Sequence, residues 1–450
     1  MDFDILPLIL ACAGGYLLLK LRFFFLLHPI RTAARGLRAI KDKRAARSFF
    51  LALAGTLGVG NVFGVAVGIL VGGAGSLLWL LVSMLFAMVI KYAEVVLTSD
   101  NLFHDTDTHG GFFYVIRNSF TRGARTLSLI YAVSTLLLSL FLGAALQTDA
   151  IRETVIEVCE IPDYQLGLIL TLLTLAAIVG GASKIERITT LIIPLTTLIY
   201  IFITFSIIIT NVDRMPEAIS EIVGGAFNIE SAVGGGLGFL LSRPVREGFA
   251  RGILSNEAGA GTSSIAHARC GILSPASAGI LGIFEVWFDT GLVCMLTGFS
   301  ILLSVDDLSA FNGGMELVMY AVGNRFGSVG KLIVLFCVFA FAFATVICWY
   351  YYGTESWCEL FGRKKRAFFL PIFLCAVYTG CYSDSYTLVN VIDILMLIAT
   401  VLTLSAVLKN SDRVRALSEN GGVIDCDYSR LRPRLIKGNV FSREAKRRRR

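Results

Sequence analysis

The chain has 450 residues, of which 55% are hydrophobic and 16% are charged, and its formal net charge is +7. Soluble domains carry about 25% charged residues, so this composition excludes a soluble globular protein and indicates an integral membrane protein. The cysteines show no spacing typical of a metal site, and we interpret them as small packing residues.

Apolar runs along the chain predict eleven transmembrane helices. They cover residues 3–27, 48–71, 76–98, 126–150, 166–182, 188–210, 248–268, 276–304, 329–353, 367–381 and 387–408. The loop from Arg31 to Arg47 is strongly basic and has Asp42 as its only acid. Placing this loop in the cytoplasm puts most other loop Lys and Arg there as well, as the positive-inside rule requires. We therefore expect a multi-pass protein of the inner (plasma) membrane, with its N-terminus outside and its C-terminus in the cytoplasm.

The second run, residues 48–71, is interrupted near its centre by glycines and by Asn61. Each glycine costs a helix roughly 1 kcal/mol relative to alanine, and free backbone at membrane depth must meet protein or a wet cavity. Residues 58–61 therefore predict a planned break that offers backbone groups to a ligand. The alternative is a packing face of glycines four residues apart, at Gly60, Gly64, Gly68 and Gly72.

Charged and polar residues inside the following runs are candidates for function. Lys91 and Glu94 are expected to reach the membrane surface or to pair. In the fourth run, polar and small residues spaced four apart form a stripe along one helix face that ends at Gln147. We interpret Gln147 as a functional residue, and Asp149 lies near the same end of the run. The alternative for the hydroxyls of this stripe is bonding between helices.

A second interruption lies at residues 251–264, where Asn256, Glu257, Gly259 and Gly261 break an apolar neighbourhood. Two interrupted segments in corresponding places of two halves are typical of the binding site of a secondary transporter. We expect Glu257 to accept exposed amides and to brace Arg251. His267 is expected to be a packing residue rather than a proton carrier.

Further along, Asp289 lies deep in its run and is a functional candidate. Thr345, with nearby carbonyls, has the oxygen donors that a hard cation prefers. The alternative is that Thr345 bonds to the carbonyl four residues earlier in its own helix.

The order of these runs predicts an all-α membrane fold built as an inverted repeat of five plus five helices, with one extra helix before it. The expected parts are 1–47 (extra helix and basic loop), 48–210 (first repeat), 211–247 (extracellular connection), 248–408 (second repeat) and 409–450 (basic tail). The tail is expected to be a disordered segment that sets the topology, and the alternative is that it contacts anionic lipid. The absence of an aromatic platform argues against a nucleic-acid partner.

These motifs resemble the alanine or glycine:cation symporter family over residues 3–408. The first break, Gly58-Val59-Gly60-Asn61, is followed by Gly64 and Gly72-Gly73, and the second runs from Arg251-Gly252 through Ser255-Asn256-Glu257-Ala258-Gly259 to Gly261 and Ala266-His267-Ala268. Supporting matches include Gln147, Asp289-Thr290, Cys294 and Thr345. The chain departs from the family pattern at Val59, Asp149, Ala260, Ser264 and Ala344.

The resemblance implies a leucine-transporter-type fold that carries alanine or glycine with sodium as the coupling ion and no other cofactor. It implies that substrate binds at Gly58, Val59, Gly60, Asn61, Gln147, Thr262 and Ser263. It implies sodium at Thr56, Asn61, Ala344 and Thr345, with Asn256, Glu257, Gly259 and Gly261 shaping the second break.

The sequence leaves one alternative function open and argues against two others. The same fold with another small amino acid, with proton coupling or with exchange without sodium, remains open. An enzyme is not expected, because the sequence has four histidines and no GxSxG motif. A channel is not expected either, since no filter motif is evident.

Overall fold

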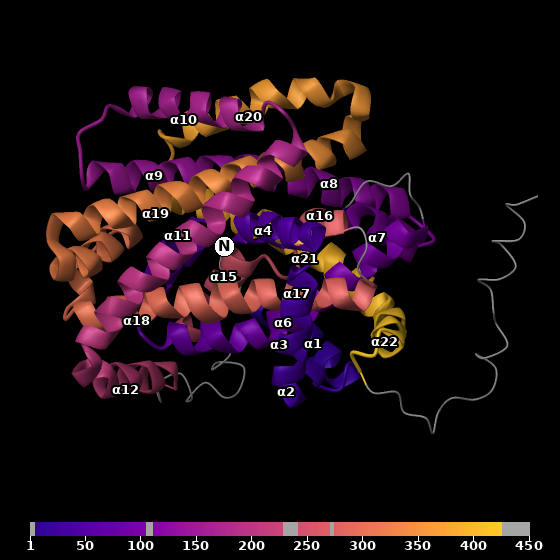
Figure 1. The fold of residues 1–450 in the computed structure, drawn as a ribbon, viewed down its shortest axis with the longest axis horizontal. Helices are drawn as coiled ribbons and strands as arrows, with labels where there is room; N and C mark the ends of the chain where they lie inside the picture. Colours follow the sequence, from indigo (N-terminus) through magenta and orange to yellow (C-terminus); the bar gives the residue numbers. More distant parts are fainter. Residues whose placement is uncertain (1–4, 105–110, 228–241, 271–273, 425–450) are drawn as a thin grey trace, which may run out of the picture.

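The computed structural model describes residues 5–104, 111–227, 242–270 and 274–424, and every regular element within these ranges is a helix (Figure 1). The predicted basic tail beyond residue 424 and part of the predicted connection 211–247 lie outside the described residues. In the described part, six helical segments are long and apolar enough to cross a membrane, and a seventh candidate is bent by 61°.

The first predicted helix is interrupted. It forms α1 (Ile5–Lys20) and α2 (Phe24–Leu27), because Arg22 and Phe23 adopt positive φ angles of 58° and 50° between them. The prediction of one helix over 3–27 was therefore wrong. The next helix, α3 (Pro29–Ile40), begins with proline in its first turn, where no intrahelical N–H is needed.

The bent candidate is the predicted first break, formed by α4 (Lys43–Thr56), the 3-10 turn η1 (Val59–Asn61) and α5 (Phe63–Gly72). The side chain of Asp42 starts α4 by accepting the backbone amides of Arg44 and Ala45 at 3.0 and 2.9 Å.

The remaining elements follow in chain order. The first group is α6 (Ser76–His104), α7 (Phe112–Ser119), α8 (Ala124–Leu140), the π-helix η2 (Phe141–Ala145), α9 (Leu146–Ile156), α10 (Asp163–Ile178), α11 (Ala182–Thr210), η3 (Val212–Arg214) and α12 (Met215–Ala226). The second group is α15 (Arg243–Asn256), α16 (Ser264–His267), η4 (Ala268–Cys270), α17 (Pro275–Val286), the π-helix η5 (Trp287–Cys294), α18 (Met295–Ser304), η6 (Leu308–Ala310), α19 (Gly314–Phe361), η7 (Arg363–Phe368), α20 (Phe369–Gly380), α21 (Ser385–Lys409) and α22 (Ser411–Asn420).

Each of the eleven predicted ranges contains helical residues, and several of them also contain turns or breaks. The long helix α19 starts earlier than predicted and kinks at Gly327, whose φ of 59° is left-handed. The range 248–268 holds only the end of α15 and the short α16, since the second break divides it. The number of membrane crossings stays a prediction.

Packing brings the two interrupted segments to the middle of the molecule. Figure 1 shows α4 and α15 near the centre, with α10 and α20 along the upper edge and α12 at the lower edge. The helix α6 packs along both α15 and α17. Gly248 allows this, since a Cβ there would lie 2.6 Å from the carbonyl oxygen of Ser76.

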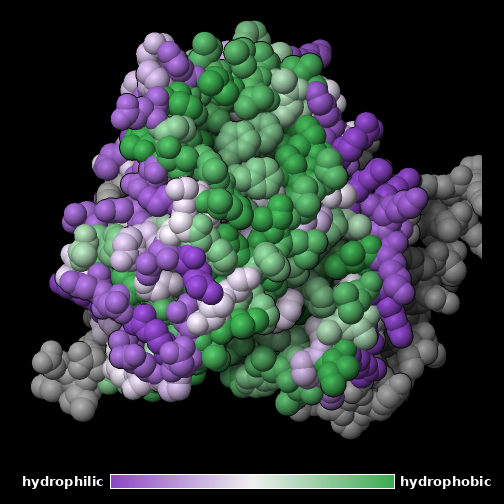
Figure 2. All heavy atoms as spheres, turned by 60° about the vertical axis from the view of Figure 1, so that its left-hand side comes forward, coloured by the Kyte–Doolittle hydropathy of each residue, from purple (hydrophilic) through white to green (hydrophobic). Residues whose placement is uncertain are grey.

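The outside of the helix bundle is apolar, as contact with lipid requires. Figure 2 shows a broad hydrophobic area bordered by hydrophilic residues on both sides. On α11 the exposed residues form a stripe with helical spacing: Leu191, Leu195, Leu198, Phe202, Phe205 and Ile209.

Candidate functional site

The first break is present as predicted, and side chains from α19 satisfy the carbonyls at the end of α4. Thr345 Oγ1 donates to the carbonyl of Ala54 at 2.9 Å, and Trp349 Nε1 donates to that of Gly55 at 3.2 Å. A helix end at membrane depth needs such partners, because no water is available there. Thr345 Oγ1 also lies 3.0 Å from the carbonyl of Phe341, so the alternative contact within its own helix is present, and its role as a cation ligand stays a prediction.

Gln147 lies directly against the first break. Its Oε1 accepts the backbone amide of Val59 at 3.1 Å, and its Nε2 donates to the carbonyl of Leu142 at 3.0 Å. A Cβ on Gly58 would lie 2.8 Å from both Gln147 Oε1 and Thr345 Oγ1. The structure therefore brings together Gly58, Val59, Gln147 and Thr345, and a side chain at position 58 would displace Gln147 or Thr345.

Asn61 joins the first break to the second and to η5. Its Nδ2 donates to Ser255 Oγ at 3.1 Å and makes a short bond to Asp289 Oδ1. Ser255 Oγ donates to Asp289 Oδ2 at 2.5 Å. A Cβ on Gly60 would lie 3.2 Å from the carbonyl oxygen of Leu254, so the two breaks touch.

Asp289 is a buried carboxylate surrounded by uncharged polar groups. Its side chain is fully buried, and in the described part of the chain no Lys or Arg forms an ion pair with it. Thr290 Oγ1 donates to its Oδ2 at 3.1 Å, and Asn61 Oδ1 is buried nearby without a hydrogen-bond partner. Oxygen atoms of Asp289, Asn61, Ser255 and Thr290 form a set of ligands that a hard cation prefers.

The second break is also present, and its backbone conformation explains its glycines. Gly259 and Gly261 have φ angles of 94° and 70°, which favour glycine, and Glu257 has a φ of 54°. Asn256 Oδ1 accepts the amide of Ala258 at 2.9 Å, and its Nδ2 donates to Thr290 Oγ1 at 3.0 Å. These residues shape the chain between α15 and α16.

A buried ionic network holds the far side of the second break. Lys91 Nζ contacts Ser263 Oγ at 2.8 Å and Glu285 Oε1 at 3.4 Å, and His267 Nε2 lies 2.6 Å from Glu285 Oε2. Glu94 Oε1 accepts the amide of Gly259 at 2.8 Å. Lys91 therefore pairs with Glu285, and Glu94 bonds to backbone; both side chains are buried inside the protein.

One expectation about this network was wrong. Glu257 does not brace Arg251, which bonds instead to Glu247 one helical turn away at 3.0 Å. Glu257 accepts the hydroxyl of Thr262 at 2.5 Å, because the left-handed turn at Glu257 directs its side chain back along the break. His267 is buried and bonds to Glu285, and its assignment as a packing residue rather than a proton carrier stays a prediction.

The remaining predicted site residues are not gathered at the first break. Thr262 and Ser263 face the ionic network. Thr56 Oγ1 approaches only carbonyls of its own helix among the described residues, at 3.4 and 3.5 Å, and Ala344 is buried beside Thr345. No hydrogen bond in the described ranges joins Asn61 to Thr345.

Asp149, expected near the substrate, bonds to Arg152 at 2.8 Å and to Ser385. Sequence reasoning missed Ser255, and it recognised Asp289 without connecting it to Asn61. The signal for Ser255 was its position directly before Asn256 in the second break.

Replacing Lys91 with methionine is expected to destabilise the protein by about 3–5 kcal/mol, because the change leaves Glu285 buried without its lysine partner. Thermal unfolding of the purified protein in detergent measures this. Lys20→Met is the matched control, since Lys20 pairs with the exposed Asp412 and such pairs contribute at most about 1 kcal/mol. Equal melting of the two variants would contradict the structural role of the network.

Comparisons with known proteins show similarity to one family of transporters. A model of the sodium:alanine symporter family matches residues 2–420. The amino-acid carrier protein AlsT of Bacillus subtilis is 30% identical over 358 residues, covering 79% of this chain and 75% of that protein. The sodium/alanine symporter AgcS of Methanococcus maripaludis is 29% identical over 357 residues, covering 78% of each chain. The probable sodium/glutamine symporter GlnT of Bacillus subtilis is 26% identical over 414 residues, covering 90% of this chain and 84% of that protein.

Proposed function

The chain belongs to the sodium:alanine symporter family and is a membrane transporter rather than an enzyme, and on that premise we propose that it carries alanine or glycine in symport with Na⁺. The observation that supports this most directly is the contact of both helix breaks with one buried carboxylate, that of Asp289.

We propose that Na⁺ binds between Asn61, Ser255, Asp289 and Thr290. The carboxylate of Asp289 supplies the negative charge, and the oxygens of the other three side chains supply neutral ligands. To ligate the ion, Asn61 turns its unpaired Oδ1 toward it. This assignment keeps Asn61 from the sequence-based prediction. Thr345, Thr56 and Ala344 remain candidates for a second cation position beside the carbonyls of α4.

We propose that the amino acid binds at Gly58, Val59 and Gly60, next to Gln147. The start of α5 offers the positive end of a half-helix to the substrate carboxylate. The bond from the Val59 amide to Gln147 is the contact that the carboxylate replaces on binding. The side chains of Gln147 and Val59 and the contact of Gly60 with Leu254 limit the pocket to a small side chain.

Transport proceeds by alternating access in this proposal. Sodium ties η1, α15 and η5 together, and the amino acid ties η1 to α9. Each ligand therefore stabilises the arrangement that the other needs, and the coupling is reciprocal by linkage. A sodium gradient then drives uptake of the amino acid.

The proposed topology has eleven crossings, with the extra N-terminal helix followed by the repeats 48–210 and 248–408. In this topology the N-terminus lies outside. The basic segment 28–47 and the tail lie in the cytoplasm. The repeats are inverted relative to each other, and α4–α5 and α15–α16 are their first segments.

A second candidate function keeps the fold and changes the cargo. The relative named as a probable sodium/glutamine symporter has a larger amino acid in its name, so another neutral amino acid is the alternative. Proton coupling, or exchange without sodium, is the alternative for the ion.

Uptake of radiolabelled alanine and glycine into proteoliposomes tests the proposal. With an inward sodium gradient, uptake is expected to exceed that without sodium at least tenfold, and unlabelled glutamine is expected to compete poorly. Uptake that ignores sodium at every pH tested would refute the coupling ion. Strong competition by glutamine would favour the alternative substrate.

A further inference from the structure

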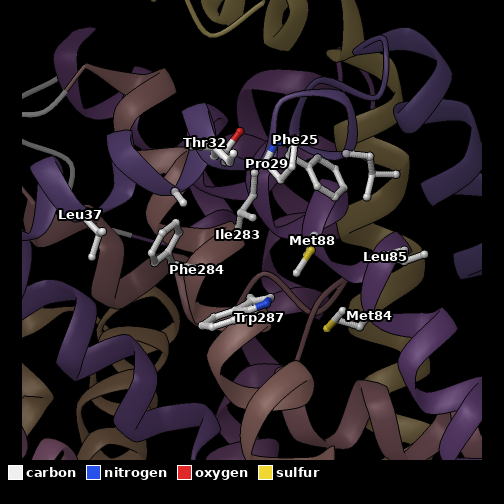
Figure 3. Close-up of a pocket in the computed structure, with 13 residues that line it drawn as sticks. Phe25, Pro29, Thr32, Leu37, Met84, Leu85, Met88, Ile283, Phe284 and Trp287 are labelled. Atoms are coloured by element: carbon white, nitrogen blue, oxygen red, sulfur yellow. The ribbon is translucent and has the colours of Figure 1, made fainter.

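A large apolar groove lies on the outside of the molecule, away from the helix breaks. Its volume is about 620 Å³, within the range of small-molecule sites, and it lies between α2–α3 on one side and α6 and α17 on the other (Figure 3). Its walls include Phe25, Leu37, Met84, Met88, Phe284 and Trp287.

The helix α3 presents two neighbouring stripes at this groove. Ile30, Ala33 and Leu37 line it, and Ile30 and Leu37 are 84% and 60% exposed. Arg31 and Arg38, each one residue further along, form a basic stripe beside them. A helix with an apolar stripe next to arginines is typical of the boundary between headgroups and acyl chains.

The groove is a fixed feature of the fold. Gly36 packs directly on α17, since a Cβ there would lie 2.4 Å from the ring of Phe284. Thr32 and Ala39 of α3 are buried in the same contact region. Packing between α3 and α17 therefore forms this apolar wall of the groove.

We propose that this groove binds an anionic phospholipid, with one acyl chain between α3, α6 and α17 and the phosphate beside Arg31 and Arg38. The charge of the basic stripe selects an anionic headgroup. The C-terminal segment of this chain is an unsuitable occupant, because it ends in Lys446-Arg447-Arg448-Arg449-Arg450 and carries the same sign of charge.

The far end of the groove is close to the proposed ion site along the chain. Trp287 lines the groove and is the first residue of η5, and Asp289 is the third. A chain bound here contacts the π-helix that positions Asp289. The binding of lipid itself does not depend on the proposed transport function.

Native mass spectrometry of the full-length protein in detergent, titrated with phosphatidylglycerol or phosphatidylcholine, tests the proposal. The wild-type protein is expected to retain one phosphatidylglycerol at least about tenfold more tightly than phosphatidylcholine. Ala33→Trp, which fills the groove, is expected to abolish this retention. Arg31→Gln/Arg38→Gln is expected to remove the preference for phosphatidylglycerol while an acyl chain still enters.

The control is Lys364→Gln/Arg366→Gln, which removes two basic residues from η7, outside the groove, and is expected to keep the wild-type preference. Equal retention of both lipids by the wild-type protein would overturn the proposal, and so would a preference that survives both groove variants. If Ala33→Trp fails to fold, quenching of tryptophan fluorescence by dibrominated phosphatidylglycerol decides instead. We expect this lipid to quench the fluorescence more strongly than dibrominated phosphatidylcholine does, and we expect the difference to disappear in Trp287→Phe. Equal quenching by the two lipids would overturn the proposal.

Discussion

Asp289→Asn is expected to lower sodium-driven amino acid uptake about 100-fold or more, and to raise the sodium concentration needed for half-maximal uptake. Asp289 is the one charged ligand in the proposed ion site, and Asn61 and Ser255 both bond to its carboxylate. Removing one partner of a buried charged interaction costs about 2–5 kcal/mol, which corresponds to this change in affinity. Sodium titrations of uptake in proteoliposomes measure it.

The matched control for this change is Asp306→Asn. Asp306 lies beyond the end of α18 and pairs with Arg214 in an exposed position, where a single ion pair contributes little. Its sodium titration is expected to coincide with that of the wild-type protein. If Asp289→Asn keeps the wild-type sodium dependence, the ion binds elsewhere, and the group around Thr345 becomes the first position to test.

Gly58→Ala is expected to reduce uptake at least about 30-fold, with the protein still folded and inserted. The added methyl group would lie 2.8 Å from both Gln147 Oε1 and Thr345 Oγ1, so one of these side chains must move. Gln147 is held by bonds to Val59 and Leu142, and Thr345 by bonds to Ala54 and Phe341. Overpacking of this kind costs about 1–3 kcal/mol and also occupies the space proposed for the substrate.

Binding of alanine by isothermal calorimetry, together with uptake, measures the effect of Gly58→Ala. Gly15→Ala in α1 is the control, since a Cβ there meets no atom within 4 Å. Near wild-type binding in Gly58→Ala would show that the substrate site is not at the first break. If Gly58→Ala fails to fold while Gly15→Ala folds normally, the role of Gly58 is structural only.

The two variants separate the two halves of the proposed mechanism. Asp289 contacts the first break from η5, whereas Gln147 and Thr345 contact it from α9 and α19. For Asp289→Asn we expect the larger defect in sodium affinity and a smaller one in amino acid binding, because the two ligands are coupled. For Gly58→Ala we expect the larger defect in amino acid binding and a smaller one in sodium affinity.

Sequence alone determined the membrane class, the approximate positions of the long apolar helices and the two breaks. These features depend on local composition: an apolar run specifies a helix in lipid, and glycine with Asn61, or with Asn256 and Glu257, specifies where that helix stops. The same local reading predicted one helix over 3–27, since neither Arg22 nor Phe23 is a residue type that favours a left-handed turn.

Tertiary structure decided which polar residues meet. Asn61 and Asp289 are 228 positions apart, and they meet because η1 packs against both α15 and η5. Lys91 meets Glu285 because α6 packs against α17. Glu257 bonds to Thr262 and not to Arg251. A buried charge in a membrane must find a partner, but the sequence offers several partners of equal chemistry. Only the packing of helices distant in the chain selects one of them.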